Sequence, residues 1–272
     1  MKVAAIQLHA GSNKAENIKL AVALVRQAIG KKAKLIVLPE VFSFQGLISS
    51  MDELKSVAES IPGESTRPFM DLARHHKVFI VAGSVYEKIS RSNKAYNTAT
   101  LINDRGRIAG KYRKIHLFEA AIGDKKVREA KNFIAGEKIV LKNIKGFNVG
   151  FSICYDLRFP RLFEAYAKKG AHIMCVPSVF TEKTGQAHWE VLLRSRAIEN
   201  LCYVIAPNQY GDNGRGIANY GHSMIVDPWG RVLSESKRKA DDIIYANLKM
   251  EVLAQSRKIL PSIFKPKFCI PL

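Results

Sequence analysis

The sequence predicts an α/β fold with a layered, mixed β-sheet, and three observations support this prediction. Short apolar runs of strand length recur from the N-terminus to about residue 248. Segments with helical periodicity lie between many of these runs. Several of the runs are apolar at almost every position, which is typical of strands that are buried on both faces. We therefore expect sheets that are covered partly by helices and partly by another sheet.

The elements follow one another along the chain at short intervals. The predicted strands are apolar runs rich in β-branched residues, at 2–8, 34–40, 78–85, 96–103, 149–153, 171–178 and 202–208. The predicted helices have apolar residues at helical spacing, at 13–29, 67–76, 157–170 and about 190–200. Gly170 is placed to cap the third of these helices. Three further strand-like runs surround the turn Pro228-Trp229-Gly230 and indicate an antiparallel ribbon.

Length and composition are those of one globular domain. The 272 residues are 47% hydrophobic, and no linker, low-complexity tract or internal repeat divides them, so we expect a single domain over residues 1–272. The N-terminal apolar run is too short for a signal peptide, and no run is as long as a membrane span. We therefore expect a soluble, cytoplasmic protein with no membrane partner.

The net charge of +19 is the one unusual feature of the composition. A basic excess can indicate a protein that binds nucleic acid or an anionic surface, and we keep this as an alternative function from another class. Lysine and arginine are spread along the whole chain, however, and no cluster is interleaved with aromatic residues. We expect no nucleic-acid partner, and a basic surface that attracts small anionic substrates.

The four cysteines lie far apart and form no Cys-x-x-Cys pair. This spacing argues against a disulfide framework or a zinc site and favours a reducing compartment. Cys175 and Cys202 lie within apolar strands, where we expect them to be inert. Cys154 instead follows a strand and precedes a helical segment, so that rigid backbone would hold a nucleophile close to free N–H groups. The alternative is that Cys154 is a small buried hydrophobic residue.

Two further polar residues end apolar segments. Glu40 follows Pro39 at the end of a buried strand and would face a cleft, where a carboxylate can act as a general base. The alternative is an exposed glutamate in a turn. Lys114 shares one strand face with Tyr112 and His116, which predicts a buried, fixed ammonium. An edge strand with protective surface charges is the alternative here.

Taken together, the three segments resemble the nitrilase superfamily of carbon–nitrogen hydrolases. They read LIVLPE, then YRKIHLF, then ICYDLRFP, with 74 residues from Glu40 to Lys114 and 40 from Lys114 to Cys154. The resemblance runs from Val3 to about Ile259. It implies an αββα sandwich that pairs through its helices into an αββααββα homodimer.

The resemblance also implies roles for individual residues. Glu40 would be the general base, Lys114 the transition-state stabiliser and Cys154 the nucleophile. Glu129 would be a second active-site glutamate that positions the lysine. The backbone N–H of Tyr155 would share the oxyanion with the lysine. The implied reaction is amide hydrolysis through a thioester, with no metal and no organic cofactor.

A small amide that carries a carboxylate is the expected substrate. Arg158, four residues after the nucleophile, could clamp that carboxylate, although an ion pair with Asp156 or Glu164 is equally open. The segments TGQAHWEVLLRSRAIEN and GHSMIVDPWG resemble the branch that contains deaminated-glutathione amidases and omega-amidases, and RFP, CYVIAPNQYG and DPWG favour the former. An omega-amidase acting on 2-oxoglutaramate and a true nitrilase acting on C≡N remain alternatives.

Overall fold

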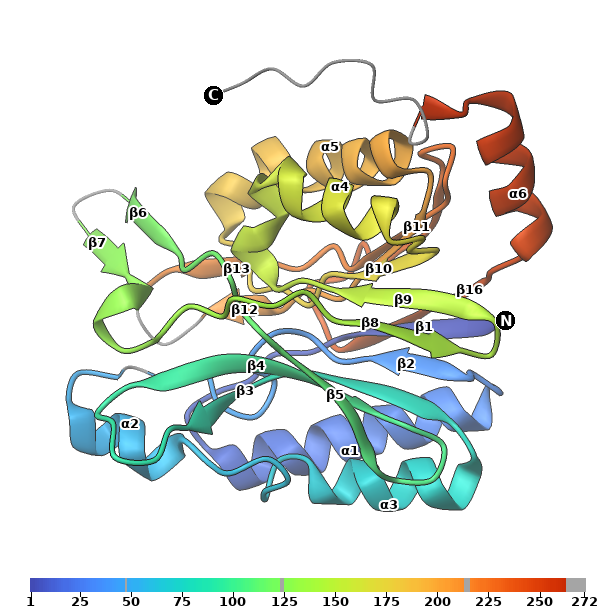
Figure 1. Cartoon of the computed structure of the whole chain (residues 1–272). Coiled ribbons are helices and arrows are strands. Elements are labelled where there is room, and N and C mark those ends of the chain that lie inside the picture. The colour runs from blue at the N-terminus through green and yellow to red at the C-terminus, as the bar shows by residue number, and fades with distance from the viewer. Residues whose placement is uncertain (47, 123–124, 213–215, 263–272) are drawn as a thin grey trace.

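Two six-stranded β-sheets lie face to face at the centre of the molecule, and α-helices cover the outer face of each sheet (Figure 1). This computed structural model describes residues 1–46, 48–122, 125–212 and 216–262. The arrangement is the αββα sandwich that the family resemblance implied. It also confirms that the sheets are covered partly by helices and partly by each other.

The first sheet and its helices come from the N-terminal half of the chain and one late strand. In chain order they are β1 Lys2–Gln7, α1 Lys14–Gly30, β2 Leu35–Val37, α2 Met51–Val57, α3 Arg67–His76, β3 Phe79–Lys88, β4 Ala95–Ile102, β5 Ile108–Arg113 and β16 Asp242–Asn247. The strand order is β16-β1-β2-β3-β4-β5. The central strands β1, β2 and β3 are parallel, and α1 and α3 cover their outer face.

The second sheet has the order β15-β14-β11-β10-β9-β8. Its strands and helices are β8 Leu141–Ile144, β9 Phe147–Phe151, α4 Pro160–Lys168, β10 Ile173–Cys175, α5 Glu182–Asn200, β11 Tyr203–Ala206, β14 Met224–Val226 and β15 Val232–Glu235. The strands β9, β10 and β11 are parallel, and α4 and α5 lie outside them (Figure 1). The helix α6, Met250–Ile259, follows β16.

Two small hairpins and two 3₁₀ turns lie outside the main sheets. The hairpins are β6 Glu119–Ile122 with β7 Lys125–Arg128, and β12 Tyr210–Asp212 with β13 Ala218–Tyr220. The 3₁₀ turns are η1, Glu129–Lys131, and η2, Cys154–Arg158. Within the described residues, no helix combines the length and the apolar character needed to cross a membrane.

The strand β1 shows why its sequence is apolar at nearly every position. Val3 and Ala5 face the second sheet and belong to the core between the two sheets. Ala4 and Ile6 point the other way, into the core beneath α1 and α3. Side chains alternate between the faces of a strand, so a sheet in the middle of four layers needs apolar residues at both sets of positions.

Two local predictions, for the segment after Cys154 and for the last three strands, differ from the structure. The segment after Cys154 does not enter an α-helix directly, because η2 comes first and α4 begins only at Pro160. The last three strands do not form one ribbon, since β14 and β15 pair with each other while β16 crosses to the first sheet and pairs with β1. Gly170, in contrast, lies just beyond α4 with φ at 79°, as the helix ending required.

The helix α5 begins at Glu182, much earlier than the predicted start near residue 190. Its first turns contain Gly185, which lowers helix propensity and hides the helical pattern. The structure explains that glycine, because a Cβ atom there would lie 2.2 Å from Cγ of Tyr220. The contact comes from the remote strand β13, so the local sequence could not reveal it.

Candidate active site

The three residues singled out by their positions at strand ends meet in one cavity. Glu40 follows β2, Lys114 directly follows β5, and Cys154 follows β9. The first two segments belong to one sheet and the third to the other, so the cavity lies where the two sheets meet. Crevices at the carboxyl ends of parallel strands are common binding places in α/β proteins. The cavity has a volume of about 150 Å³.

A tight crossing of two chain segments directs Glu40 inward. Gly83 in β3 packs closely against the two residues that precede Glu40. A Cβ atom on Gly83 would lie 1.9 Å from the carbonyl oxygen of Leu38. Val41, which directly follows Glu40, has φ at 46°, and its N–H donates to Ser84 Oγ at 2.9 Å. The backbone therefore bends sharply around Glu40, whose residue surface is only 3% exposed. An exposed glutamate in a turn is excluded.

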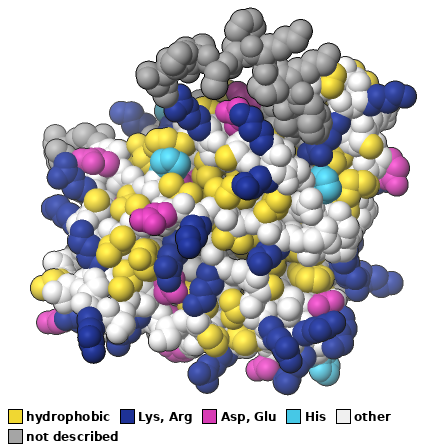
Figure 2. All heavy atoms as spheres, in the orientation of Figure 1, with side chains coloured by type: hydrophobic (Ala, Val, Ile, Leu, Met, Phe, Trp, Pro, Cys, Tyr) yellow, Lys and Arg dark blue, Asp and Glu magenta, His cyan; other side chains and the backbone are white. Residues whose placement is uncertain are grey.

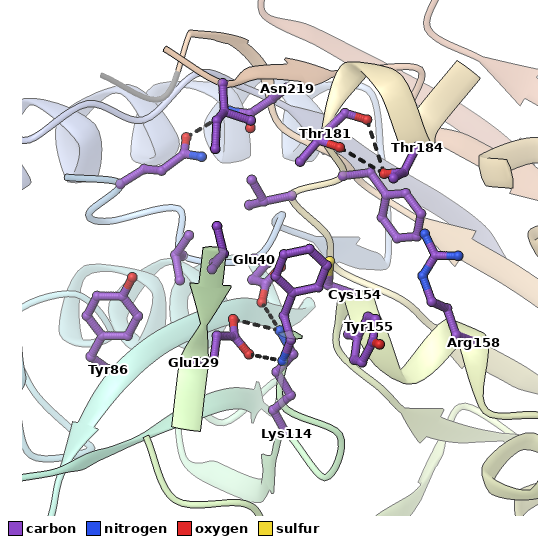
Figure 3. Close-up of a pocket in the computed structure, with 17 residues that line it drawn as sticks. Glu40, Tyr86, Lys114, Glu129, Cys154, Tyr155, Arg158, Thr181, Thr184 and Asn219 are labelled. Atoms are coloured by element: carbon purple, nitrogen blue, oxygen red, sulfur yellow. Dashed lines mark hydrogen bonds and ion pairs between the residues drawn. The ribbon is translucent and has the colours of Figure 1, made fainter. Parts of the chain in front are cut away.

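Lys114 is a buried ammonium held by two carboxylates. Its Nζ lies 2.9 Å from Glu40 Oε1 and 3.0 Å from Glu129 Oε1 (Figure 3). Burial alone would lower the pKa of Lys114, but the charges of Glu129 and Glu40 outweigh it and hold the pKa well above its ordinary value. The lysine is therefore charged at neutral pH. An edge-strand lysine facing solvent is excluded, since the residue is 1% exposed.

Glu129 begins η1 and lines the same cavity as Glu40 and Lys114. One carboxylate oxygen contacts Lys114, and the other accepts from the backbone N–H of Phe118 at 2.7 Å. Burial raises the pKa of Glu129, Lys114 opposes this effect, and the negative charge of Glu40 adds to it. Two carboxylates thus share one ammonium, and they fix its position from two sides.

Cys154 begins η2 in a left-handed conformation, with φ at 46°. Such a conformation in a residue other than glycine costs about 1–3 kcal/mol and persists only where the surroundings enforce it. The N–H of Cys154 donates to the Pro177 carbonyl at 3.0 Å. Burial raises the pKa of the thiol well above its ordinary value, the charge of Glu40 adds to this, and Lys114 opposes it. The resting side chain is therefore a thiol.

Tyr155 and Arg158 line the same cavity. Among the described residues, the backbone N–H of Tyr155 has no acceptor, so it is available to an oxyanion. The Tyr155 ring packs edge-on against Phe118, with 5.1 Å between ring centroids. In Figure 3 the Arg158 side chain lies on the Cys154 side of the cavity, away from the two glutamates.

Neither expected ion pair of Arg158 forms. The Asp156 carboxylate faces Tyr112 and His116 instead, and Glu164 pairs with Lys168 along α4. The guanidinium of Arg158 lies over the Phe180 ring, 5.3 Å from its centroid. Its Nη1 is 3.3 Å from Nδ1 of His188, within α5. The guanidinium therefore keeps most of its donors for a ligand.

Several residues of the site escaped prediction. Asn97 in β4 donates to Glu40 Oε1 at 2.8 Å, and Gln209 donates to the Glu40 carbonyl at 2.7 Å. Thr181, Thr184 and Asn219 line the cavity. The only local signal for Asn97 was a polar amide inside an apolar strand, and its partner lies 57 residues away. Among the described residues, no group of three or more His, Cys, Asp or Glu side chains is arranged to hold a metal ion.

The fold and this cavity define a hydrolase of the nitrilase type, and comparison with known proteins agrees. The carbon–nitrogen hydrolase family model matches residues 2–258, and the chain belongs to that family. It is an amidase that hydrolyses non-peptide C–N bonds.

The relatives place the chain in one branch of the family. It is 38% identical to a "Deaminated glutathione amidase" from Synechocystis, covering 96% of both chains. It is 35% identical to "Omega-amidase NIT2" from Danio rerio, covering 96% of this chain and 92% of that protein. The crystal structure of Saccharomyces cerevisiae Nit3, described as a member of branch 10 of the nitrilase superfamily, superposes with a TM-score of 0.87 at 33% identity, covering 98% of this chain and 97% of that one.

Proposed function

We propose that this chain hydrolyses the amide of deaminated glutathione, with Cys154 as nucleophile, Glu40 as general base and Lys114 as the cation that stabilises the oxyanion. One observation carries the proposal. A single cavity holds all three side chains, with Glu129 against the ammonium and Arg158 on the wall. The resemblance of the branch supports the choice of substrate.

The first half-reaction forms a thioester. Glu40 Oε1 already accepts from Lys114 and Asn97, which leaves Oε2 to take the thiol proton as the sulfur attacks the amide carbon. The carbonyl oxygen becomes an oxyanion, which Lys114 Nζ and the N–H of Tyr155 stabilise. Glu40 then gives its proton to the departing nitrogen. The C–N bond breaks, and the acyl group remains on Cys154.

The second half-reaction returns the enzyme to its starting state. Glu40 takes a proton from a water molecule whose oxygen attacks the thioester carbon. The tetrahedral oxyanion uses the same two donors, the C–S bond breaks, and the sulfur recovers its proton from Glu40. Because the pKa of the Cys154 thiol is raised, the thiolate forms only while Glu40 accepts the proton, and it is then a strong nucleophile.

Charge supports an anionic substrate. The donors of Arg158 suit a carboxylate, because a guanidinium can bind both carboxylate oxygens at once. Lysine and arginine side chains are also spread over the whole face of the molecule seen in Figure 2, which attracts small anions without a directed basic stripe. This dispersed pattern argues against the alternative of a nucleic-acid or anionic-surface binding protein.

Two alternatives keep the chemistry and change the substrate. The similarity to an omega-amidase favours 2-oxoglutaramate as the second candidate. A true nitrilase would begin with the same attack of Cys154, on the carbon of a C≡N bond.

The test offers the candidates separately to the purified chain. Deaminated glutathione should release 2-oxoglutarate and Cys-Gly, whereas 2-oxoglutaramate would release 2-oxoglutarate and ammonia. Intact-mass spectrometry of quenched enzyme should show a 2-oxoglutaryl group on Cys154. A clear preference for 2-oxoglutaramate assigns the chain to the omega-amidases. Turnover of neither amide refutes the substrate and leaves the catalytic roles to the variants described below.

We also propose that the chain forms a homodimer through α4 and α5. Val191 and Ile198 lie seven residues apart on α5, on one side of the helix, and are 65% and 43% exposed. Light scattering should give the mass of two 30.4 kDa chains. The double variant Val191→Asp, Ile198→Asp should be monomeric, whereas Ile259→Asp on α6 should remain dimeric. A monomeric wild-type chain refutes the proposal.

A reducing, cytoplasmic location is proposed on the state of the thiols. Cys154, Cys175 and Cys202 are all free and buried, and reducing compartments keep such thiols unpaired. Cell fractionation with compartment markers tests this location. Recovery of the protein from an oxidising compartment would contradict it.

A further inference from the structure

Asp156 is a fully buried carboxylate that the proposed reaction does not use. It lies two residues after Cys154 in η2 and is 0% exposed. A buried carboxylate is costly unless hydrogen bonds satisfy its oxygens. Every donor that satisfies Asp156 belongs to a residue next to the nucleophile or close to the catalytic lysine.

Four donors share the two oxygens. Oδ2 accepts from the Tyr112 hydroxyl at 2.6 Å and from the backbone N–H of Ile153 at 2.9 Å. Oδ1 accepts from the backbone N–H of His116 at 2.9 Å and contacts Nδ1 of its ring at 2.7 Å. Tyr112 and His116 are two residues before and two residues after Lys114. Ile153 directly precedes the nucleophile.

The backbone N–H groups of the two catalytic residues are hydrogen-bonded to different sheets. The N–H of Lys114 donates to the Asn97 carbonyl in the first sheet at 2.8 Å. The N–H of Cys154 donates to the Pro177 carbonyl, beyond β10 of the second sheet. A small slide of one sheet over the other would therefore change the separation of the ammonium and the thiol. Asp156 joins the two segments directly beside both groups.

We propose that Asp156 is a positioning residue for the amidase reaction: its carboxylate ties the Lys114 segment to the Cys154 turn and thereby sets the distance between ammonium and thiol. This inference rests on the proposed roles of Lys114 and Cys154. It also accounts for the strained backbone of the nucleophile, because the bond to Ile153 closes the turn in which Cys154 has its positive φ. Misplacing a catalytic group by about 1 Å can cost about 10²-fold in rate.

The test compares two buried tyrosines that each donate one short hydrogen bond. Tyr112→Phe removes one donor from Asp156. Tyr166→Phe is the matched control, since its hydroxyl donates to the Phe151 carbonyl of β9 at 2.6 Å and not to Asp156. Both variants should fold, as shown by circular dichroism, and both should lose some stability. Tyr112→Phe should lower kcat about tenfold with KM within about twofold, whereas Tyr166→Phe should leave both within twofold.

Alkylation gives a second readout that needs no substrate turnover. Lys114 lowers the pKa of the Cys154 thiol, so a displaced ammonium should slow the reaction of Cys154 with iodoacetamide at pH 8, measured on the Cys154 peptide by mass spectrometry. Tyr112→Phe should slow it several-fold, Asp156→Asn should slow it further, and Tyr166→Phe should not. Equal alkylation rates in Tyr112→Phe and Tyr166→Phe would overturn the inference.

A double-mutant cycle separates positioning from general support of the fold. In the background of Lys114→Met, Tyr112→Phe should change the residual kcat by less than twofold, because the group that it positions is gone. A tenfold effect that persists in this background would refute the positioning role. If Lys114→Met itself leaves kcat within tenfold of wild type, the proposed function fails. If Lys114→Met is impaired and Tyr112→Phe is not, only the positioning inference fails.

Discussion

Cys154 and Cys175 are buried thiols at the ends of neighbouring parallel strands, yet their surroundings differ in kind. Cys175 is the last residue of β10, and burial alone raises its pKa. Burial raises the pKa of Cys154 as well, and Cys154 additionally has Glu40 and Lys114 beside it. Burial and a raised pKa therefore do not distinguish Cys175 from Cys154, the nucleophile that we propose. The difference between them is the carboxylate and the ammonium that share the cavity with Cys154.

The largest expected effect tests this comparison directly. Cys154→Ala should lower kcat by at least about 10⁴-fold, because no acyl-enzyme can form. Cys175→Ala should keep kcat close to wild type and should lower the free energy of unfolding, since it leaves a small cavity in the core. Steady-state kinetics and urea unfolding of both variants measure the two quantities. Loss of activity in Cys175→Ala with activity retained in Cys154→Ala would reverse the assignment.

Removing the cation should have the next largest effect. Lys114→Met keeps much of the buried stem and removes the ammonium, so kcat should fall about 10²–10³-fold through the lost oxyanion donor. The variant also leaves Glu40 and Glu129 without their shared partner, so its fold must be verified by circular dichroism. A folded variant that retains more than about a tenth of wild-type kcat would contradict the role, since that loss is only about 1.4 kcal/mol.

The sequence revealed Glu40, Lys114 and Cys154 because each ends an apolar segment, and a strand end is a local pattern. The hydrogen bonds around these residues could not be predicted, because most of them join residues that are far apart in the sequence. For Asp156 the sequence suggested one partner, Arg158, two residues further along the chain. Besides the nearby N–H of Ile153, its partners are Tyr112 and His116, which lie 44 and 40 residues away and meet Asp156 only when the two sheets pack.

The same physical reason explains the misplaced start of α5 and the path of β16. Gly185 lies in α5 because the Tyr220 side chain leaves no room for a Cβ atom there. The strand β16 joins the first sheet because it pairs with the free edge of β1. Periodicity reports which face of an element is buried and not which element covers it. The family resemblance supplied the missing information for the sheets. It did not supply the orientation of Arg158, which the ring of Phe180 beside it helps to define.

A smaller effect is expected for Arg158, which we propose binds the substrate and does not take part in the reaction itself. Arg158→Met should raise KM for an anionic amide about tenfold or more while changing kcat less, because a charge-assisted hydrogen bond contributes about 1.5–3 kcal/mol. Arg161→Met is the matched control, since Arg161 is three residues away and exposed. The two variants lose the same charge, so an equal rise in KM would show that Arg158 acts only through the net charge.

The smallest expected effect concerns the pKa of the buried thiols, which burial raises in each of them. Burial raises the pKa of Cys202 to about 12, whereas an unfolded thiol titrates near 8.5. Above pH 8.5 the unfolded chain loses a proton that the folded chain keeps, so the free energy of unfolding falls as pH rises towards 12. Between pH 7 and pH 10 this costs about 2 kcal/mol per thiol. Cys202→Ala should therefore lose less stability over this range than wild type, by about that amount, in urea unfolding at the two pH values.

Cys154→Ala should show a change of the same sign, because burial raises both pKa values. If Cys202→Ala has the same pH dependence as wild type, the Cys202 thiol is not desolvated in the folded chain. Burial would then no longer be a property that Cys202 shares with Cys154.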